Sequence, residues 1–148
     1  MLEVGDTAPE LSAETTQGRF DLSEADEEGA VVLFFFPKAG SRVCTKEACS
    51  FRDSTAEFND VDATVVGVSS NDSLERLEEF AEKNSLDFPL VSDTDGEISK
   101  KYGAKGVLGL YSKRVTYVIE DGEVVGRVKG MLSADRHVEG SIEALRQI

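Results

Sequence analysis

Residues 34–53, FFFPKAGSRVCTKEACSFRD, join a strongly apolar run to the two cysteines of the chain. The stretch overlaps AVVLFFF, residues 30–36, whose continuous apolar and β-prone side chains predict a strand that is buried on both faces. Pro37 ends this strand, and we expect a helix from about residue 43 to about residue 58. A buried strand that leads directly into a helix is typical of an α/β fold.

The remainder of the chain also alternates between strand and helix patterns. Residues 6–25 predict a short hairpin with Gly18 between two small apolar patches. The pair Asp121-Gly122 predicts a two-residue turn between two further strands. The expected later strands are residues 63–70, 88–93, 114–119 and 123–129, the expected helices are residues 71–84, 96–103 and 134–147, and residues 104–113 are expected to form a surface loop.

Two of these helices are amphipathic, which predicts the side that each one buries. The first is capped by Asp72 or Ser73, and the second by Ser133. The apolar face of the first holds Leu74, Leu77, Phe80 and Ala81, and that of the second holds Ala134, Val138, Ile142 and Leu145. The order of elements predicts one domain over residues 1–148, an α/β sandwich with a mixed central sheet flanked by helices and an N-terminal hairpin.

The charge of the chain narrows the classes of partner and location. With 16 Lys and Arg against 29 Asp and Glu, the formal net charge is −13. An acidic surface repels phosphate backbones, so we expect no nucleic-acid partner. We find no apolar run of bilayer length and no signal peptide, so we expect no membrane association and a cytoplasmic location. The acidic residues are spread out as on a solvated face, and adaptation to a salt-rich cytoplasm is a second interpretation.

The cysteine content argues against both a disulfide framework and a metal site. Two cysteines are too few for a disulfide-stapled fold. A structural zinc site usually needs four Cys or His ligands, and the single histidine, His137, is distant in sequence. We therefore expect no metal and no cofactor, and we expect His137 to be exposed and inert on the last helix.

Cys44 occupies a position that favours a reactive thiolate. It lies in the expected first turn of a helix, where free N–H groups and the helix dipole attract negative charge, and Arg42 is two residues away. The alternative is structural, because Cys44 begins a helical stripe of apolar positions and could be a small buried hydrophobe. Cys49 could likewise be a buried or idle thiol. The rest of that stripe is Ala48, Phe51, Thr55 and Phe58.

The spacing of the two cysteines opposes a disulfide inside an intact helix. Five helical residues rotate by about 140° and rise by about 7.5 Å, which separates the two Cα atoms by about 8.6 Å. A disulfide needs Cα atoms within about 7 Å. Cys44 and Cys49 can therefore bond only if the first turns of the helix unwind, which suits a catalytic cycle better than a structural crosslink.

The stretch FFFPKAGSRVCTKEACSFRD resembles the active-site segment of peroxiredoxins, of the AhpC/TSA superfamily. Pro37, Ser41 and Cys44 match the pattern Pro-x-x-x-Thr/Ser-x-x-Cys, and Cys49 matches the second cysteine of the bacterioferritin-comigratory or PrxQ type. The segments VGDTAPELSAETTQG, VVGVSSND, FAEKNSLDFPLVSD and RVTYVIEDGEVV also follow the order and spacing of that family. The resemblance implies a thioredoxin-like fold.

The resemblance also implies a role for each matched residue. Cys44 would be the peroxidatic cysteine, whose thiolate attacks a hydroperoxide and becomes a sulfenic acid, and Cys49 would be the resolving cysteine that forms a disulfide with it. Ser41 would align the peroxide, and Pro37 would shield the sulfenic acid. Arg114 would lie against the thiolate and stabilise charge on the leaving oxygen, unless it is an ordinary surface residue of a strand.

The expected activity is therefore an antioxidant, thiol-dependent peroxidase that a thioredoxin-like dithiol recycles. The resemblance allows a monomer or a weak dimer. Ser41 stands where threonine is more usual, and Arg42 and Val43 replace a frequent Pro-Gly pair, so rate and substrate preference are open. Two alternatives remain: a redox sensor whose helix melts on oxidation, and a thiol–disulfide oxidoreductase, which would usually carry a C-x-x-C pair.

Overall fold

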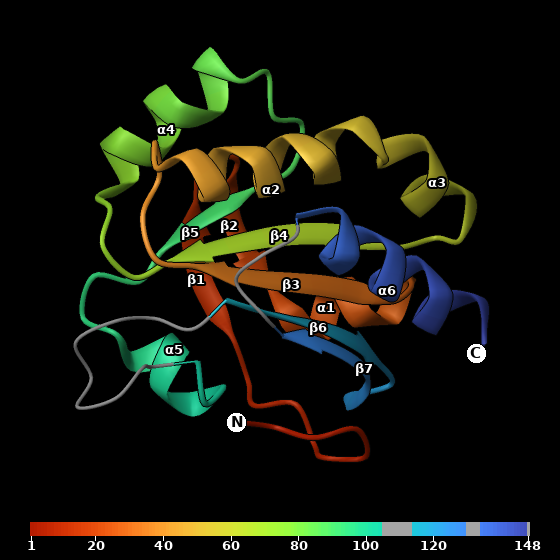
Figure 1. Ribbon diagram of the computed structural model, residues 1–148. Coiled ribbons are helices and arrows are strands. Elements are labelled where there is room, and N and C mark those ends of the chain that lie inside the picture. The colour runs from red at the N-terminus through yellow and green to blue at the C-terminus, as the bar shows by residue number, and fades with distance from the viewer. Residues whose placement is uncertain (105–113, 130–133, 148) are drawn as a thin grey trace.

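A mixed seven-stranded sheet forms the centre of the computed structural model, which describes residues 1–104, 114–129 and 134–147 (Figure 1). The strand order is β2-β1-β5-β4-β3-β6-β7. Strands β3, β4 and β5 are parallel, and the other pairings are antiparallel. The strands are β1 Ser12–Thr15, β2 Gly18–Asp21, β3 Val31–Phe36, β4 Thr64–Ser69, β5 Leu90–Ser92, β6 Val115–Glu120 and β7 Glu123–Lys129.

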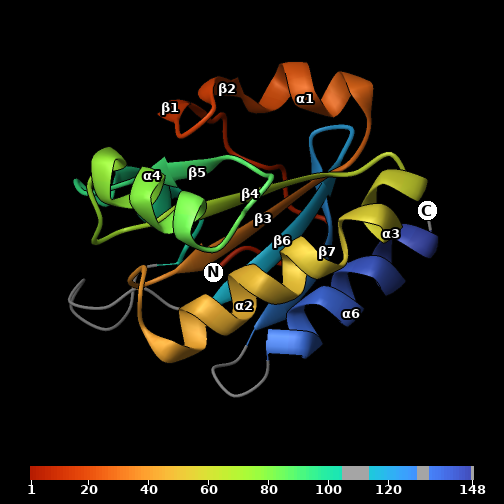
Figure 2. The same cartoon turned by 90° about the horizontal axis from the view of Figure 1, so that it is seen from above.

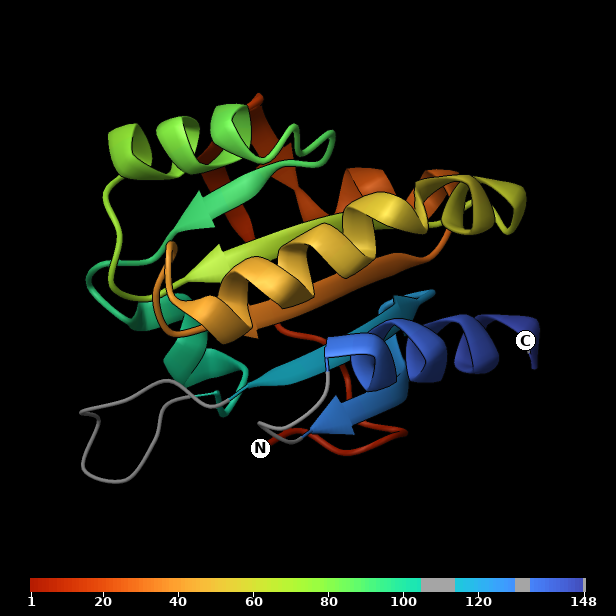
Figure 3. The same cartoon turned by 45° about the horizontal axis from the view of Figure 1, so that its top comes forward.

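Helices cover both faces of the sheet, and α2 and α6 lie side by side on one of them (Figures 2 and 3). The apolar core on that face is formed by α2, α3, α4 and α6, and the core on the other face includes side chains of α1 and of the α5 region. This arrangement confirms the thioredoxin-like sandwich. The helices are α1 Leu22–Glu28, α2 Arg42–Asp53, α3 Thr55–Asp60, α4 Leu74–Lys83, α5 Glu97–Lys101 and α6 Ala134–Arg146.

Strand β3 is the central strand that the apolar run predicts. All six of its residues are buried. Val32, Phe34 and Phe36 pack into the core beneath α2, while the alternate residues pack into the core on the opposite face. Because β3 pairs with β4 on one side and β6 on the other, its carboxyl end lies at mid-sheet, where α2 begins.

The expected hairpins and the cap of α4 are also confirmed. Strands β1 and β2 form the N-terminal hairpin. Asp121 and Gly122 both have left-handed φ, 53° and 75°, as a two-residue turn of this kind requires. Of the two candidate caps of α4, Ser73 is the one that accepts a backbone N–H, and Asp72 is buried instead.

The helix expected over residues 43–58 is wrong in one respect, because the structure divides it into α2 and α3 at Ser54. Oγ1 of Thr55 lies 2.8 Å from the carbonyl oxygen of Arg52 and 3.1 Å from Oδ1 of Asp87, and its one hydroxyl proton can be donated to either. Ser and Thr side chains that bond to nearby backbone compete with helical hydrogen bonds. This local competition accounts for the break, which the apolar stripe does not reveal.

The expectation that His137 is exposed is also wrong. His137 is 2% exposed, and its Nδ1 lies 2.7 Å from Oγ1 of Thr116 on β6. The predicted apolar positions Val138, Ile142 and Leu145 are buried as expected. Helix α6 packs against both the β6–β7 hairpin and α2, so its buried face is wider than one apolar stripe and includes His137.

Some expectations lie outside the described residues. These are residues 105–113 of the predicted loop, the cap Ser133 and the side chain of Ala134. Ala104, which the sequence places in that surface loop, is buried. No helix in the described part of the chain is long and apolar enough to cross a membrane.

Candidate active site around Cys44

The loop between β3 and α2 starts the site. Pro37 follows β3 directly and is partly exposed, and its carbonyl accepts a hydrogen bond from the side chain of Asn71 at 2.6 Å. Ser41 has extended backbone and caps α2, where its Oγ accepts the N–H of Cys44 at 3.3 Å. The same hydroxyl donates to the carbonyl of Lys38 at 3.1 Å. Ser41 therefore holds the first turn of α2 in register with the loop.

Cys44 is fully buried in that first turn and is a free thiol group. Its sulfur is 2.7 Å from Nη2 of Arg114, which donates to it. Arg114 immediately precedes β6, and because Val115 pairs with Phe35, the guanidinium reaches the end of β3 where α2 starts. Cys44 is thus part of the apolar core, as the structural interpretation expects, and also contacts a cation.

Glu47 completes a buried group with these two side chains. Its Oε2 lies 3.3 Å from Nη1 of Arg114, and the carboxyl is 1% exposed. Burial raises the pKa of Glu47 to about 7, and the nearby Arg114 opposes that shift only in part. The sequence reasoning missed Glu47, although its position three residues after Cys44 places both on one helix face.

The cation that contacts the sulfur is therefore Arg114 and not Arg42. Arg42, which lies two residues before Cys44 in the sequence, is exposed at the start of α2. Its neighbour Val43 is 39% exposed, which is unusual for a large apolar side chain. The Arg42 cation is thus exposed to solvent, and the buried cation is Arg114, which immediately precedes β6, seventy residues away in sequence.

Cys49 lies further along the same helix and is a half-buried free thiol. Its sulfur is 3.8 Å from Oδ1 of Asn84, the residue at the carboxyl end of α4. Arg52, one turn on, donates to the carbonyl of Asn84 at 2.7 Å. Helix α2 is continuous from Cys44 to Cys49, and within it the two thiols are unbonded, as helical geometry requires.

The described residues include no group of three or more His, Cys, Asp or Glu side chains that could hold a metal ion. The chemistry on view is that of a buried sulfur hydrogen-bonded to a guanidinium at a helix N-terminus. Such a site stabilises a negative sulfur, because the guanidinium donates to it and the dipole of α2 favours negative charge at the first turn.

Comparisons with known proteins place this geometry in context. Residues 4–128 match the AhpC/TSA family. A putative peroxiredoxin of Mycobacterium tuberculosis is 40% identical over 153 residues, which cover 99% of this chain and 98% of that protein. The chloroplastic peroxiredoxin Q of Sedum lineare is 33% identical over 146 residues, which cover 97% of this chain and 78% of that protein.

The fold has a near counterpart among solved structures. The crystal structure of peroxidoxin BcpB from Mycobacterium tuberculosis superposes with a TM-score of 0.92 at 38% identity, covering 100% of this chain and 99% of that one. Similarity of this extent, over the whole sheet and its helices, includes the elements that carry Cys44, Cys49 and Arg114.

Proposed function

Because the chain belongs to the AhpC/TSA family of peroxiredoxins, which are thiol peroxidases, we propose that Cys44 is its peroxidatic cysteine and Cys49 its resolving cysteine. The observation that carries this proposal is the 2.7 Å contact between the buried Cys44 sulfur and Nη2 of Arg114. Charge-assisted hydrogen bonds of this kind strengthen when the acceptor is anionic. The contact favours the thiolate, which is the nucleophilic form of cysteine.

In the first step the Cys44 thiolate attacks the terminal oxygen of a hydroperoxide. A sulfur–oxygen bond forms while the oxygen–oxygen bond breaks, so the sulfur is oxidised to sulfenic acid and the peroxide is reduced. The leaving oxygen departs with the electron pair of the broken bond, takes a proton and is released as water or alcohol. Arg114 already lies at the sulfur and can donate to the oxygen on which charge develops.

The proposal gives the loop residues supporting roles. The Ser41 hydroxyl caps the Cys44 amide, and rotation away from the Lys38 carbonyl would let it donate to a bound peroxide. Pro37 borders the same loop and would limit access of water to the sulfenic acid. Neither role needs a metal or an organic cofactor.

In the second step the Cys49 sulfur attacks the sulfenic sulfur of Cys44. A disulfide forms and water leaves, so both thiols are oxidised by one molecule of peroxide. Since both residues lie on one continuous helix, the first turns of α2 must unwind before the sulfurs can meet. A thioredoxin-like dithiol then attacks the disulfide and restores both thiols by exchange, which suits a cytoplasmic antioxidant.

The proposal is tested by following hydrogen peroxide consumption in the native protein, Cys44→Ser and Cys49→Ser, with thioredoxin or with a small thiol as reductant. Native protein should turn over with both reductants, and Cys44→Ser with neither. Cys49→Ser should keep activity with the small thiol and lose it with thioredoxin. Full activity of Cys44→Ser would overturn the assignment.

The same experiment separates the two alternatives. One stoichiometric oxidation without turnover, despite efficient re-reduction, would support a redox sensor. Reduction of insulin disulfides without any need for peroxide would support a thiol–disulfide oxidoreductase. Each assay is run at low and at high salt, because a chain with a net charge of −13 repels itself when screening is weak.

A further inference from the structure

Asp72 is a buried acidic residue outside the Cys44 site that the reaction steps above do not use. It lies between β4 and α4 and is 1% exposed, whereas Ser73 beside it caps the helix. Removing a carboxylate from water is unfavourable unless several donors replace the lost hydration. The donors around Asp72 therefore indicate what this residue is for.

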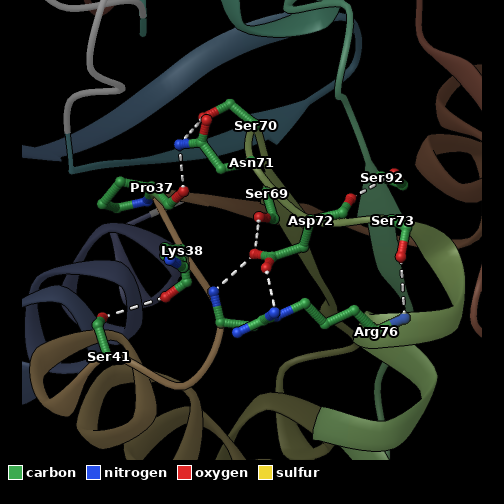
Figure 4. Close-up of polar contacts among 11 residues, drawn as sticks. Pro37, Lys38, Ser41, Ser69, Ser70, Asn71, Asp72, Ser73, Arg76 and Ser92 are labelled. Carbon is green, nitrogen blue, oxygen red and sulfur yellow. Dashed lines mark hydrogen bonds and ion pairs between the residues drawn. The ribbon is translucent and has the colours of Figure 1, made fainter.

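Three groups from different elements meet the Asp72 carboxylate (Figure 4). The hydroxyl of Ser69, at the end of β4, donates to Oδ2 at 2.5 Å, and Nε of Arg76 on α4 lies 3.1 Å from Oδ1. The third is the backbone N–H of Ala39, which donates to Oδ2 at 2.6 Å. Ser69 and Arg76 lie within four residues of Asp72, so the Ala39 bond is the one that reaches a distant segment.

Ala39 belongs to the loop that carries Pro37 and Ser41. Asn71, the residue before Asp72, donates its side-chain N–H to the carbonyl of Pro37 at 2.6 Å (Figure 4). Asn71 and Asp72 of the β4–α4 loop thus bond to Pro37 and Ala39, and we call these two hydrogen bonds the tether. Gly40 follows Ala39 and has a φ of +87°, a conformation that favours glycine. The tether therefore ends one residue before a glycine whose backbone has more conformational freedom than that of other residues.

We propose that Asp72 is a positioning residue that fixes the loop of residues 37–41 and thereby holds Cys44 in the folded, peroxide-reactive arrangement. The inference rests on the proposed function. The tether lies on the amino-terminal side of the segment that must unwind, and the Arg52–Asn84 bond lies on the carboxyl-terminal side. Asp72 and Asn71 therefore set where unwinding begins and how readily it occurs.

This position gives Asp72 an influence on the fate of the sulfenic acid. In the folded arrangement, the sulfenic sulfur can react with a second hydroperoxide, which transfers an oxygen, leaves as water or alcohol and produces sulfinic acid. In the unwound arrangement Cys49 reaches the same sulfur first and forms the disulfide. A weaker tether therefore slows the first oxidation and protects against the second.

The experiment uses Asp72→Ala and Asn71→Ala in the full chain. Asn71 is exposed, so its variant keeps the test usable if Asp72→Ala fails to fold. The matched control is Ser92→Ala, because Ser92 donates to the backbone carbonyl of Asp72 at 2.6 Å without reaching the loop. Three quantities are measured: kcat/KM for hydrogen peroxide, the ratio of sulfinic acid to disulfide by mass spectrometry, and hydrogen exchange of residues 40–48 in the reduced protein.

We expect both tether variants to lower kcat/KM by about ten- to a hundredfold, since small misplacements of reacting groups have effects of that size. The ratio of sulfinic acid to disulfide should fall in both, exchange over residues 40–48 should speed up, and Ser92→Ala should match native protein. A folded tether variant with native exchange and a native product ratio would overturn the inference. Hydrogen exchange does not depend on peroxide chemistry, whereas a native protein that consumes no peroxide would overturn the proposed function itself.

Discussion

At the scale of single residues, the site depends on how one guanidinium is shared. Arg114 contacts the Cys44 sulfur through Nη2 and the Glu47 carboxyl through Nη1. All three side chains are buried, so water screens their interactions poorly. The charge state of any one of them therefore affects the other two.

Arg114→Gln should lower kcat/KM for hydrogen peroxide by about 10²- to 10³-fold, the range seen when one donor to a developing anion is removed. The reason is that the glutamine side chain is neutral and cannot make both contacts. Stopped-flow measurement of peroxide reduction checks this. Arg146→Gln serves as control, since Arg146 is an exposed residue of α6 paired with Glu57, and it should retain native kinetics. A native rate constant in Arg114→Gln would remove Arg114 from the proposed mechanism.

Glu47 should make the free energy of unfolding depend on pH. Burial raises its pKa from 4.5 to about 7, so the folded protein binds this proton more tightly than the unfolded chain does. The stability that this tighter proton binding contributes to the folded protein is fully present below pH 4.5 and is lost as the pH rises through about 7. Urea unfolding at several pH values should show this loss in native protein and a smaller one in Glu47→Gln. Glu57→Gln, at an exposed carboxylate, should follow native protein, and identical profiles in all three would contradict the burial effect.

At the scale of elements, the proposed cycle makes two opposing demands on α2. Its intact first turn presents Cys44 to the cap at Ser41, and the same turn keeps Cys44 away from Cys49. A helix that is stable enough to hold the thiolate must still open during every proposed cycle. The local stability of the first turns of α2 therefore affects the rate of the proposed cycle.

Oxidation should reduce the helix content of the protein. One equivalent of peroxide should join Cys44 to Cys49, and the first turns of α2 should be lost because the intact helix keeps the sulfurs apart. Far-ultraviolet circular dichroism before and after oxidation, with peptide mapping of the disulfide, measures both changes. Cys49→Ser treated in the same way should retain its helix signal. An intramolecular disulfide with undiminished helix would contradict this account.

Ser41→Ala should destabilise the protein and also slow its reaction with peroxide. Loss of the cap of α2 costs about 1 kcal/mol of folding free energy. Ser73→Ala is matched to it, since Ser73 caps α4 with the same kind of bond to a backbone N–H. Both variants should lose similar stability in urea, but only Ser41→Ala should lower kcat/KM for peroxide. Ser41→Thr should restore both stability and kcat/KM. Equal kcat/KM in the two alanine variants would show that Ser41 only caps the helix.

At the scale of the whole molecule, the net charge of −13 acts on every element at once. Carboxylates spread over the surface repel one another, and this repulsion opposes the compact state when ionic strength is low. The protein should therefore gain stability as salt screens the surface.

The melting temperature should rise between about 0.01 M and about 0.15 M sodium chloride, since the Debye length falls over that range from about 30 Å to about 8 Å. A gain of about 1 kcal/mol corresponds to a rise of about 3 °C for a chain of this size. Differential scanning calorimetry measures the shift, and potassium chloride at equal ionic strength should give the same value. A constant melting temperature would show that repulsion between surface carboxylates does not lower the stability of the protein at low salt.

Much of this architecture could be predicted from short stretches of sequence. The buried strand at residues 31–36, the turn at Asp121-Gly122 and the amphipathic face around Leu77 and Phe80 all depend on neighbours within a few residues. The place of Cys44 in the first turn of a helix, and its separation from Cys49, follow from the same local geometry. These features are determined by propensity and periodicity, so the sequence alone contains them.

The tertiary structure decided the rest, because the remaining contacts join residues that no local pattern connects. Arg114 reaches Cys44 only through the pairing of β6 with β3, and Asp72 reaches Ala39 only through the loops that follow β3 and β4. His137 is buried because α6 meets two neighbours at once. Register, packing and burial are properties of the assembled sheet, and they determine which of the sequence's charged and polar groups meet the sulfur.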